Sequence, residues 1–219
     1  EPISLSNKNV AKALKDKVGL VSGAAGSIGS EICRQVLHYS PKKLILLDQA
    51  ESPLYDLQFE LKNNEPYKNM GVPMEFVIAN VKDYRKMKDV FERFKPQVVY
   101  HAAAYKHVPL MEEFPYEAVY VNVFGTKNVV DLAINHKVEK FVMVSTDKAV
   151  NPTNVMGATK RIAEIYTQSR QSAETKFITT RFGNVLGSNG SVIPLFKKQI
   201  ANGGPVTVRR KNQEDKAVT

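Results

Sequence analysis

Short apolar runs alternate along this chain with segments whose apolar residues recur at helical spacing. Most of the runs are apolar on both faces, as buried parallel strands are. They lie at Lys17–Ser22, Lys43–Asp48, Met74–Ala79, Gln97–Ala102, Lys140–Ser145 and Phe177–Phe182. Helical stripes lie between them at Ser27–His38, Pro53–Lys62, Asp83–Phe94, Val119–Ala133 and Val155–Ser169. This alternation predicts an α/β fold with a doubly wound, mostly parallel sheet, whose ligand crevice lies beyond the carboxyl ends of the strands.

The length of the chain limits how many domains it can form. Its 219 residues, 43% of them apolar, suit one compact domain, or one domain and a fragment. Apolar stretches such as Leu44–Leu47 are far shorter than the roughly 20 residues that cross a bilayer, so this segment is expected to be soluble. The chain begins at Glu1 without an initiator methionine, which indicates a piece of a longer protein.

The net charge of +9 raises the question of a nucleic-acid partner. Only Arg209–Lys211 forms a basic cluster, and no aromatic residues are interleaved with it to stack bases. The charge therefore indicates a solvated surface, and no nucleic-acid partner is expected. The single Cys33 lies beside apolar residues of a predicted helix, which favours burial. The histidines show no metal-ligand spacing, so no metal is expected.

A glycine-rich loop follows the first predicted strand and opens a helix. Gly23, Gly26 and Gly29, with Ser27 and Ile28 between them, have the spacing of a Rossmann-like dinucleotide loop. In such a loop the glycines allow a tight turn, close approach of a pyrophosphate and close packing of the helix on the sheet. The pattern alone is weak, because glycines also serve ordinary turns.

Asp48 strengthens the dinucleotide hypothesis. It ends the second strand about 20 residues after the loop, where a carboxylate accepts hydrogen bonds from an adenosine ribose and repels a 2′-phosphate. NAD is therefore favoured over NADP. The competing interpretation makes Asp48 a helix cap before Pro53. Asn80 and Val81, after the third strand, are expected to border the adenine, although a simple turn explains them almost as well.

A second polar group follows the fifth strand. Thr146, Asp147 and Lys148 come directly after it, and Met156 and Lys160 are spaced i, i+4 on the next helix, so both can face the crevice. This arrangement resembles the extended short-chain dehydrogenase/reductase family, which has a tyrosine where this chain has Met156. A thioether has no exchangeable proton. Three explanations fit a methionine at this position: an inactive site, a binding module, or an enzyme in which another residue serves as the base. Taken separately, Thr146 could simply end a strand, Asp147 cap a turn, Lys148 lie in solvent and Met156 fill the core.

Longer stretches narrow the resemblance. His101–Glu112, Ser145–Arg161 and Arg181–Gly187 resemble the polysaccharide-biosynthesis branch of UDP-N-acetylglucosamine 4,6-dehydratases, in which methionine is the usual occupant. The resemblance implies an upstream, membrane-linked leader over residues 1–15 and an NAD-binding catalytic domain over 16–208. Residues 209–219 form an unassigned tail where the smaller substrate lobe is largely missing. It also implies an enzyme at the cytoplasmic face of a bacterial membrane. A homo-oligomer is one of the assemblies considered.

The family reaction assigns roles to these residues. It oxidises C4 of a UDP-sugar with NAD, eliminates water across C5 and C6, and returns hydride to C6. By resemblance, Thr146 contacts O4, Asp147 is the acid for the C6 hydroxyl, and Lys148 is the C5 base. For that last role its pKa would have to fall through burial or nearby cations. Asp147 relaying protons alone is the alternative.

The resemblance also implies binding residues. Lys160 would hold the nicotinamide ribose, and the loop Ala102, Ala103 and Ala104 would border the cofactor. The residues expected at the sugar nucleotide are Lys106, His107, Asn122, Arg181 and Asn184. Asn122 is expected to support the site through hydrogen bonding. The alternatives are a surface histidine for His107 and helix packing for Asn122. A nucleotide-sugar 4-epimerase and a non-catalytic NAD-binding module are the competing functions.

Overall fold

The computed structural model describes residues 8–170, 172, 174–183, 185, 192–208 and 216–218. Contacts divide the chain into two compact units, Glu1–Phe182 and Gly183–Thr219, which are described separately. The first seven residues of the expected leader, the expected substrate residue Asn184 and the Arg209–Lys211 cluster lie outside the described residues.

The first unit is built on a parallel sheet. Its described part has six strands in the order β3-β2-β1-β4-β5-β6, and every neighbouring pair is parallel. The strands are β1 Val18–Ser22, β2 Lys43–Asp48, β3 Met74–Ile78, β4 Val98–His101, β5 Lys140–Thr146 and β6 Lys176–Phe182. The order reverses between β1 and β4, which is where doubly wound folds bind ligands. The predicted fold class is confirmed.

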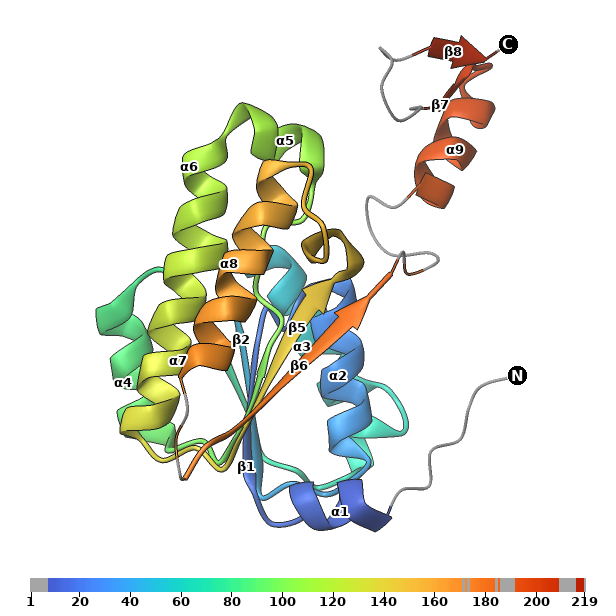
Figure 1. Cartoon of the computed structure of the whole chain (residues 1–219). Helices are drawn as coiled ribbons and strands as arrows, with labels where there is room; N and C mark the ends of the chain where they lie inside the picture. The colour runs from blue at the N-terminus through green and yellow to red at the C-terminus, as the bar shows by residue number, and fades with distance from the viewer. Residues whose placement is uncertain are drawn as a thin grey trace. The chain divides into compact units, whose positions relative to one another are not determined.

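Helices cover both faces of this sheet (Figure 1). Leu20, Ile45 and Leu47 face a cluster that includes α4 and α7, whereas Val21, Leu44 and Leu46 face α2 and α3. The alternation along β1 and β2 explains why these strands are apolar on both faces. The helices of the first unit are α1 Lys8–Leu14, α2 Ser27–Leu37, α3 Glu51–Asn63, α4 Tyr84–Phe94, α5 Val108–Glu113, α6 Pro115–Ala118, α7 Thr126–Asn135 and α8 Val155–Ser169, with short 3₁₀ turns at Tyr67–Asn69 and Asp147–Ala149.

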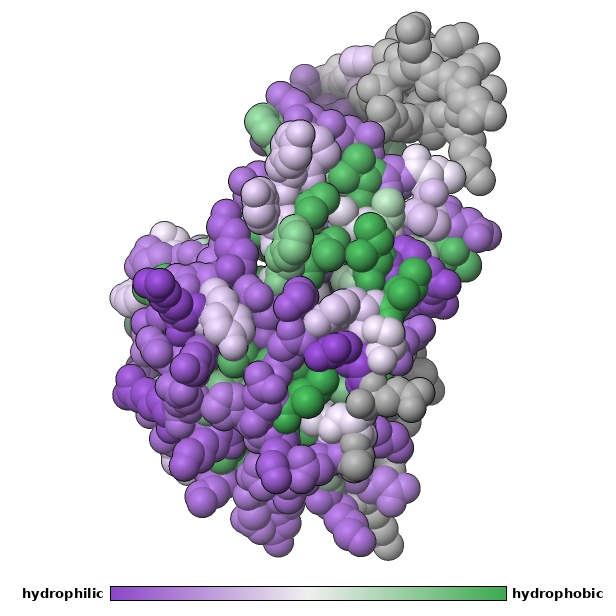
Figure 2. Space-filling view, turned by 60° about the vertical axis from the view of Figure 1, so that its left-hand side comes forward, coloured by the Kyte–Doolittle hydropathy of each residue, from purple (hydrophilic) through white to green (hydrophobic). Residues whose placement is uncertain are grey.

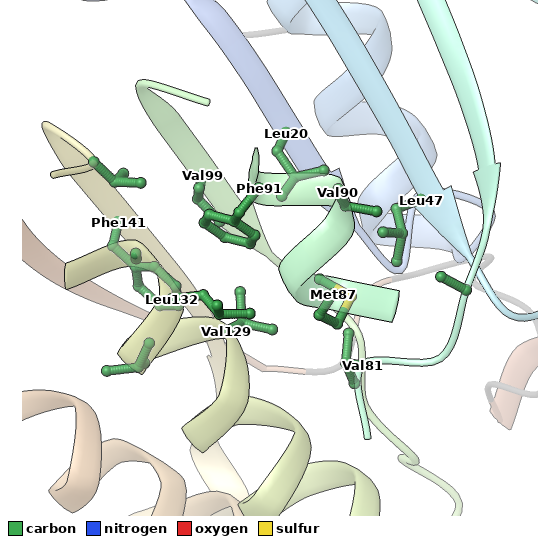
Figure 3. Close-up of a cluster of buried hydrophobic side chains, with 14 of the residues drawn as sticks. Leu20, Leu47, Val81, Met87, Val90, Phe91, Val99, Val129, Leu132 and Phe141 are labelled. Atoms are coloured by element: carbon green, nitrogen blue, oxygen red, sulfur yellow. The ribbon is translucent and has the colours of Figure 1, made fainter. Parts of the chain in front are cut away.

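The larger core cluster lies between the sheet and α4 and α7 (Figure 3). Phe91 and Met87 of α4 are fully buried there, and so is Phe141 of β5. Phe141 also contacts the rings of His101 and Phe177 at centroid distances of 5.9 and 5.5 Å. Phe141 therefore packs against residues of both strands that neighbour β5, namely β4 and β6.

One predicted helix has a different form. The stripe expected to form a single helix over Val119–Ala133 is a π-helix, η2, at Val119–Gly125, followed by α7. Apolar spacing does not separate i→i+4 from i→i+5 hydrogen bonding, so the sequence pattern could not reveal the change. The wider turns matter because Val121 and Asn122 lie in this segment, next to the candidate site.

The second unit is small in its described part. It contains α9 Val192–Ala201 and the antiparallel pair β7 Val206–Val208 and β8 Lys216–Val218. The expected boundary of the catalytic domain at residue 208 and the expected tail at 209–219 stay predictions.

Large apolar side chains are exposed on α6, η2 and α8: Tyr116, Tyr120, Phe124, Ile162 and Ile165. Figure 2 shows apolar surface gathered in the upper half of one face, with hydrophilic surface around it. Among the described residues, none of the helices has the length and apolar character needed to span a bilayer. The expected homo-oligomer and membrane attachment stay predictions.

Replacing Phe141 with alanine should strongly destabilise the first unit. The ring is fully buried between β4, β6 and α7, and removing such a ring from a core costs about 3–5 kcal/mol. Urea denaturation followed by circular dichroism measures the loss. The matched change Phe59→Ala, at a ring that is 58% exposed, should stay within about 0.5 kcal/mol of the parent. Equal losses in the two variants would contradict this description of the core.

Candidate active site

The loops after β1, β2, β3 and β4 enclose a pocket of about 210 Å³ at the carboxyl edge of the sheet. Eight of the residues expected to bind the cofactor line it: Gly23, Gly26, Asp48, Asn80, Val81, Ala102, Ala103 and Ala104. Ser27, Ile28 and Gly29 form the first turn of α2, directly after the lining residue Gly26. The structure therefore brings the predicted nucleotide residues together at the switch point of the sheet.

The glycine loop is compact because side chains would collide in it. A Cβ on Gly23 would lie 2.5 Å from the Ala103 nitrogen, and Gly23 has a φ of +72°. A Cβ on Gly29 would lie 1.9 Å from the Gly23 carbonyl oxygen. Without side chains, the loop packs directly against the backbone after β4. The N-terminus of α2 stays open, and its backbone N–H groups and helix dipole favour an anion there. This cradle fits the pyrophosphate of a dinucleotide.

Asp48 joins two of the pocket's loops. One carboxylate oxygen accepts from the Ala25 N–H and the other from the Ala50 N–H, both at 2.9 Å. The N-cap of α3 is Ala50, without a side-chain cap, so Asp48 is not the cap residue of that helix. A carboxylate has about four acceptor positions, so two remain for ribose hydroxyls.

A hydrogen-bonded bridge that the sequence did not reveal runs along the pocket. The Asn80 amide donates to the side-chain oxygen of Gln49, and the Gln49 amide donates to the Tyr105 hydroxyl at 3.3 Å. Gln49 follows Asp48 directly, and this position at a strand end is the only sequence signal for it. The bridge links the loops after β2, β3 and β4.

A buried polar chain lies beneath the pocket. Thr126 donates to the Asn122 carbonyl oxygen at 2.7 Å, so its hydroxyl oxygen accepts from Nε2 of His101 at 2.9 Å. Nδ1 of His101 then accepts from the Ser22 hydroxyl at 2.7 Å. Burial, aided by the nearby charge of Lys160, lowers the pKa of His101 to about 3. A neutral histidine therefore ties the end of β4 to β1 and α7.

Asn122 acts as a support. Its side chain is fully buried, accepts from the Tyr105 N–H at 2.8 Å, and donates to the Tyr105 carbonyl at 3.0 Å and to Thr159 at 3.1 Å. These bonds hold the loop after β4 against α8. The expected direct contact of Asn122 with substrate is corrected, because the amide is committed to protein groups; the hydrogen-bonding support that the sequence suggested fits the geometry.

The group after β5 converges on one carboxylate oxygen. Thr146 donates to Oδ1 of Asp147 at 3.0 Å, and Nζ of Lys148 lies 3.3 Å from the same atom. The hydrogen bond from Thr146, together with Lys148, lowers the pKa of Asp147, so this carboxyl group is ionised at neutral pH. The Lys148 side chain is 39% exposed. This side chain therefore lies partly in solvent.

Lys160 and Met156 both face inward from α8. The residue Lys160 is 4% exposed and its ammonium donates to the Val144 carbonyl at 2.8 Å. Burial lowers the pKa of Lys160 to about 8, although Glu164 opposes the shift. The sequence groups Met156 with the catalytic residues, but the structure corrects this: Met156 is 3% exposed and packs with Met111 and Ala118. Its thioether fills an apolar space under the loop after β4.

The remaining expected substrate residues lie in two places. Lys106 and His107 border a second pocket of about 250 Å³ with Leu110, Met111 and Phe114. Arg181, near the end of β6, is held by Glu164 through two hydrogen bonds of 2.9 and 2.7 Å. Glu164 is fully buried and was not identified from the sequence. Within the described residues, no cluster of three or more histidine, cysteine or acidic side chains could hold a metal.

Gly29→Ala should weaken dinucleotide binding at least tenfold, because the added methyl would overlap the Gly23 carbonyl oxygen and push the loop out of place. Fluorescence titration with NADH measures the affinity. Gly26→Ala is the graded comparison, since its Cβ would lie 3.3 Å from the same oxygen and should cost less. The opposite ranking of the two variants would contradict the geometry of the loop.

Comparisons with known proteins agree with this geometry. The family described as polysaccharide biosynthesis protein matches residues 19–213. The chain is 54% identical to the capsular polysaccharide biosynthesis protein CapD of Staphylococcus aureus, over 95% of this chain and 35% of that protein. It is 36% identical to the UDP-glucose 4-epimerase of Rickettsia rickettsii, over 88% of this chain and 56% of that protein.

Two solved structures share the fold. Pen from Bacillus thuringiensis has a TM-score of 0.78 and 40% identity, over 86% of this chain and 56% of that one. The UDP-glucose 4-epimerase of Thermus thermophilus, solved with NAD, has a TM-score of 0.67 and 25% identity, over 86% and 64% of the two chains. This chain thus spans about a third of the CapD protein and just over half of Pen. Because the family match covers most of its residues, the chain belongs to the polysaccharide biosynthesis protein family, with the fold of the extended short-chain dehydrogenases/reductases.

Proposed function

We propose that this chain is the NAD-binding part of a nucleotide-sugar 4,6-dehydratase that acts on UDP-N-acetylglucosamine in the synthesis of a surface polysaccharide. The observation that carries the proposal is the meeting of Thr146 and Lys148 at Oδ1 of Asp147, at the carboxyl edge that also forms the nucleotide pocket. This group can exchange protons with a sugar without a tyrosine. Membership in a polysaccharide biosynthesis family supports the pathway.

The residues of the first pocket fit NAD. Gly23 and Gly26 form the pyrophosphate cradle, Asp48 offers free acceptor positions to a ribose, and Asn80 and Val81 border the adenine side. The negative charge of Asp48 disfavours the extra phosphate of NADP. When bound, NAD supplies reversible hydride transfer at the sugar.

The first task of the protein is at O4 of the sugar. Thr146 would contact this oxygen and pass its proton to Oδ1 of Asp147, which is ionised at neutral pH and can therefore accept it. Lys160 would favour negative charge on O4 through its ammonium group. This order changes the starting role of Asp147: it must gain a proton before it can act as the expected acid.

The second task is the loss of water across C5 and C6. A protonated Asp147 would give its proton to the departing C6 hydroxyl, while Lys148 or Asp147 takes the proton from C5 and returns one there afterwards. Two protons leave the sugar, from O4 and C5, and two are delivered, to the hydroxyl and to C5, so the protein ends unchanged. The pairing of Lys148 with Asp147 supports a shared relay more than a separate base.

Met156 has a supporting task in this proposal. Packed with Met111 and Ala118, it supports the Tyr105 segment from below and keeps water out of the space that a tyrosine would occupy. Lys106 and His107, beside Tyr105, are proposed to border the sugar nucleotide. Arg181 and Asn184 are proposed to contact it from the chain at and after the end of β6.

A nucleotide-sugar 4-epimerase is the second candidate. The similarity to the UDP-glucose 4-epimerase of Rickettsia rickettsii favours it. An epimerase also oxidises C4 and could use Thr146 and Asp147 at O4, but it needs no acid or base at C5 and C6, so it would leave Lys148 without a task. A non-catalytic NAD-binding module is the third candidate, and activity separates it from the first two.

The setting of the whole protein is part of the proposal. Residues 16–208 are proposed as the NAD-binding catalytic domain, and the residues before them as a connection to a membrane-attached region at the inner face of a bacterial membrane. The remaining substrate lobe and tail would lie in and after the second unit. Activity is therefore to be measured on a protein of the length of its relatives.

The full-length protein should convert UDP-N-acetylglucosamine into a UDP-4-keto-6-deoxy sugar in deuterium oxide. Proton NMR should show a new C6 methyl signal and one deuterium at C5, because the C5 proton exchanges through the relay. An epimerase would give a C4 epimer that keeps its C5 proton. A protein that binds NAD but leaves the sugar unchanged would contradict both enzyme hypotheses.

Asp147→Asn should lower kcat by about 10²–10⁴-fold, since it removes the group that carries the proton between sugar atoms. The affinity for NADH should stay unchanged, because Asp147 lies outside the nucleotide pocket. The control Asp89→Asn removes an exposed carboxylate on α4 and should leave kcat unchanged. Full activity of Asp147→Asn would exclude the relay.

A further inference from the structure

Glu164 is a buried charge to which the proposed reaction gives no task. Its side chain is fully buried in α8, one turn after Lys160 and on the same face of the helix. Burying an isolated carboxylate is costly, so natural proteins bury one only with partners. The partners of Glu164 therefore indicate what it does.

Two arginines bind this carboxylate from different elements. Arg181 of β6 donates through Nε and Nη2 at 2.9 and 2.7 Å, and Arg161 of α8 donates through Nη1 at 3.1 Å. Burial alone would raise the pKa of Glu164, but the hydrogen bonds of its polar neighbours, those of Arg181 foremost, outweigh it and lower the pKa to about 2. Glu164 is therefore charged at every physiological pH.

Lys160 is the group that gains from this charge. Its ammonium is buried, and the one hydrogen bond described for it is to the Val144 carbonyl oxygen, an uncharged acceptor. Burial favours the neutral amine, and the charge of Glu164 opposes that effect. A neutral Lys160 could not favour negative charge on a sugar oxygen.

The other groups around Lys160 do not replace Glu164. On β4, His101 is neutral and contributes no charge. After β5, Asp147 and Lys148 form a pair of opposite charges. From α5, Glu112 accepts from the Val155 N–H at the first residue of α8. The buried anion that remains on the face of Lys160 is Glu164, and the arginines on it would by themselves disfavour the ammonium.

We propose that Glu164 is a positioning residue that holds the buried Lys160 in its charged form while its two arginines anchor α8 to the end of β6. The proposal rests on the function proposed for Lys160, but it concerns a charge state that can be measured without turnover. It also gives Arg181 a structural role, because its bonds to Glu164 fix the end of β6 to α8.

The test is a pH titration of Lys160 in the full-length protein. Protein labelled with ¹³C at the lysine Cε positions is titrated by NMR, and Lys160→Met assigns the signal. The parent should titrate near pH 8. Glu164→Gln should lower the midpoint by about one pH unit, because the anion is lost and the arginines remain. Arg181→Met should raise the midpoint, because it removes a cation and leaves Glu164 charged.

Opposite shifts in these two variants cannot come from general destabilisation. Thr167→Val is the matched control: it removes a buried hydroxyl from the same face of α8 without changing charge. It should lower the thermal stability and leave the Lys160 midpoint in place. If Glu164→Gln does not fold, the direction in which Arg181→Met shifts the Lys160 midpoint still tests the inference.

The pH profile of kcat links this result to catalysis. In Glu164→Gln the alkaline limb should move to lower pH together with the NMR midpoint. A midpoint that is unmoved or raised in Glu164→Gln, or lowered in Arg181→Met, would overturn the inference even if the protein is a dehydratase. The predicted shifts without any dehydratase activity would instead leave the inference standing and remove the proposed function.

Discussion

The close approach of two backbones at the centre of the sheet is the constraint on which the site depends. β1 and β4 are neighbours, and the loop after β1 touches the chain after β4 so tightly that a Cβ on Gly23 would lie 2.5 Å from a backbone nitrogen. Since the strand order reverses here, the loops on either side diverge and open a pocket. The nucleotide pocket is thus a consequence of the sheet order together with a glycine at one position.

Buried polar groups keep this arrangement in place. Neutral His101 links β1 to α7, Asn122 fixes the loop after β4 to α8, and Glu164 fixes α8 to β6. Each of these groups is fully buried and has its hydrogen-bond partners, which is the condition under which polar side chains stabilise an interior. The charged groups of the proposed site, Lys160 and Asp147, are consequently carried by elements that these bonds fix to one another.

The sequence predicted what depends on local pattern. The strands were predictable because apolar residues face both helix layers. The pocket was predictable because Gly23 and Gly26 lie in the loop after β1 and Asp48 ends β2, in a known order. The π-helix was not predictable, because apolar spacing does not distinguish i→i+4 from i→i+5 hydrogen bonds. The Gln49 bridge and the bond from Arg181 to Glu164 were not predictable, because they join residues far apart in the chain. The sequence predicted that Met156 lies on the inward face of its helix, but only the structure shows that Met111 and Ala118 pack against its side chain and bury it.

The central claim is that one crevice, at the carboxyl edge of the sheet, holds the dinucleotide beside the polar group after β5. Residue-resolved NMR of the ¹⁵N-labelled protein during titration with NAD tests it most directly. The account predicts shifts in the amide signals after β1, β2, β3 and β4, continuing to Thr146, Asp147 and the first turns of α8. Shifts confined to the nucleotide loops, with none after β5, would contradict it.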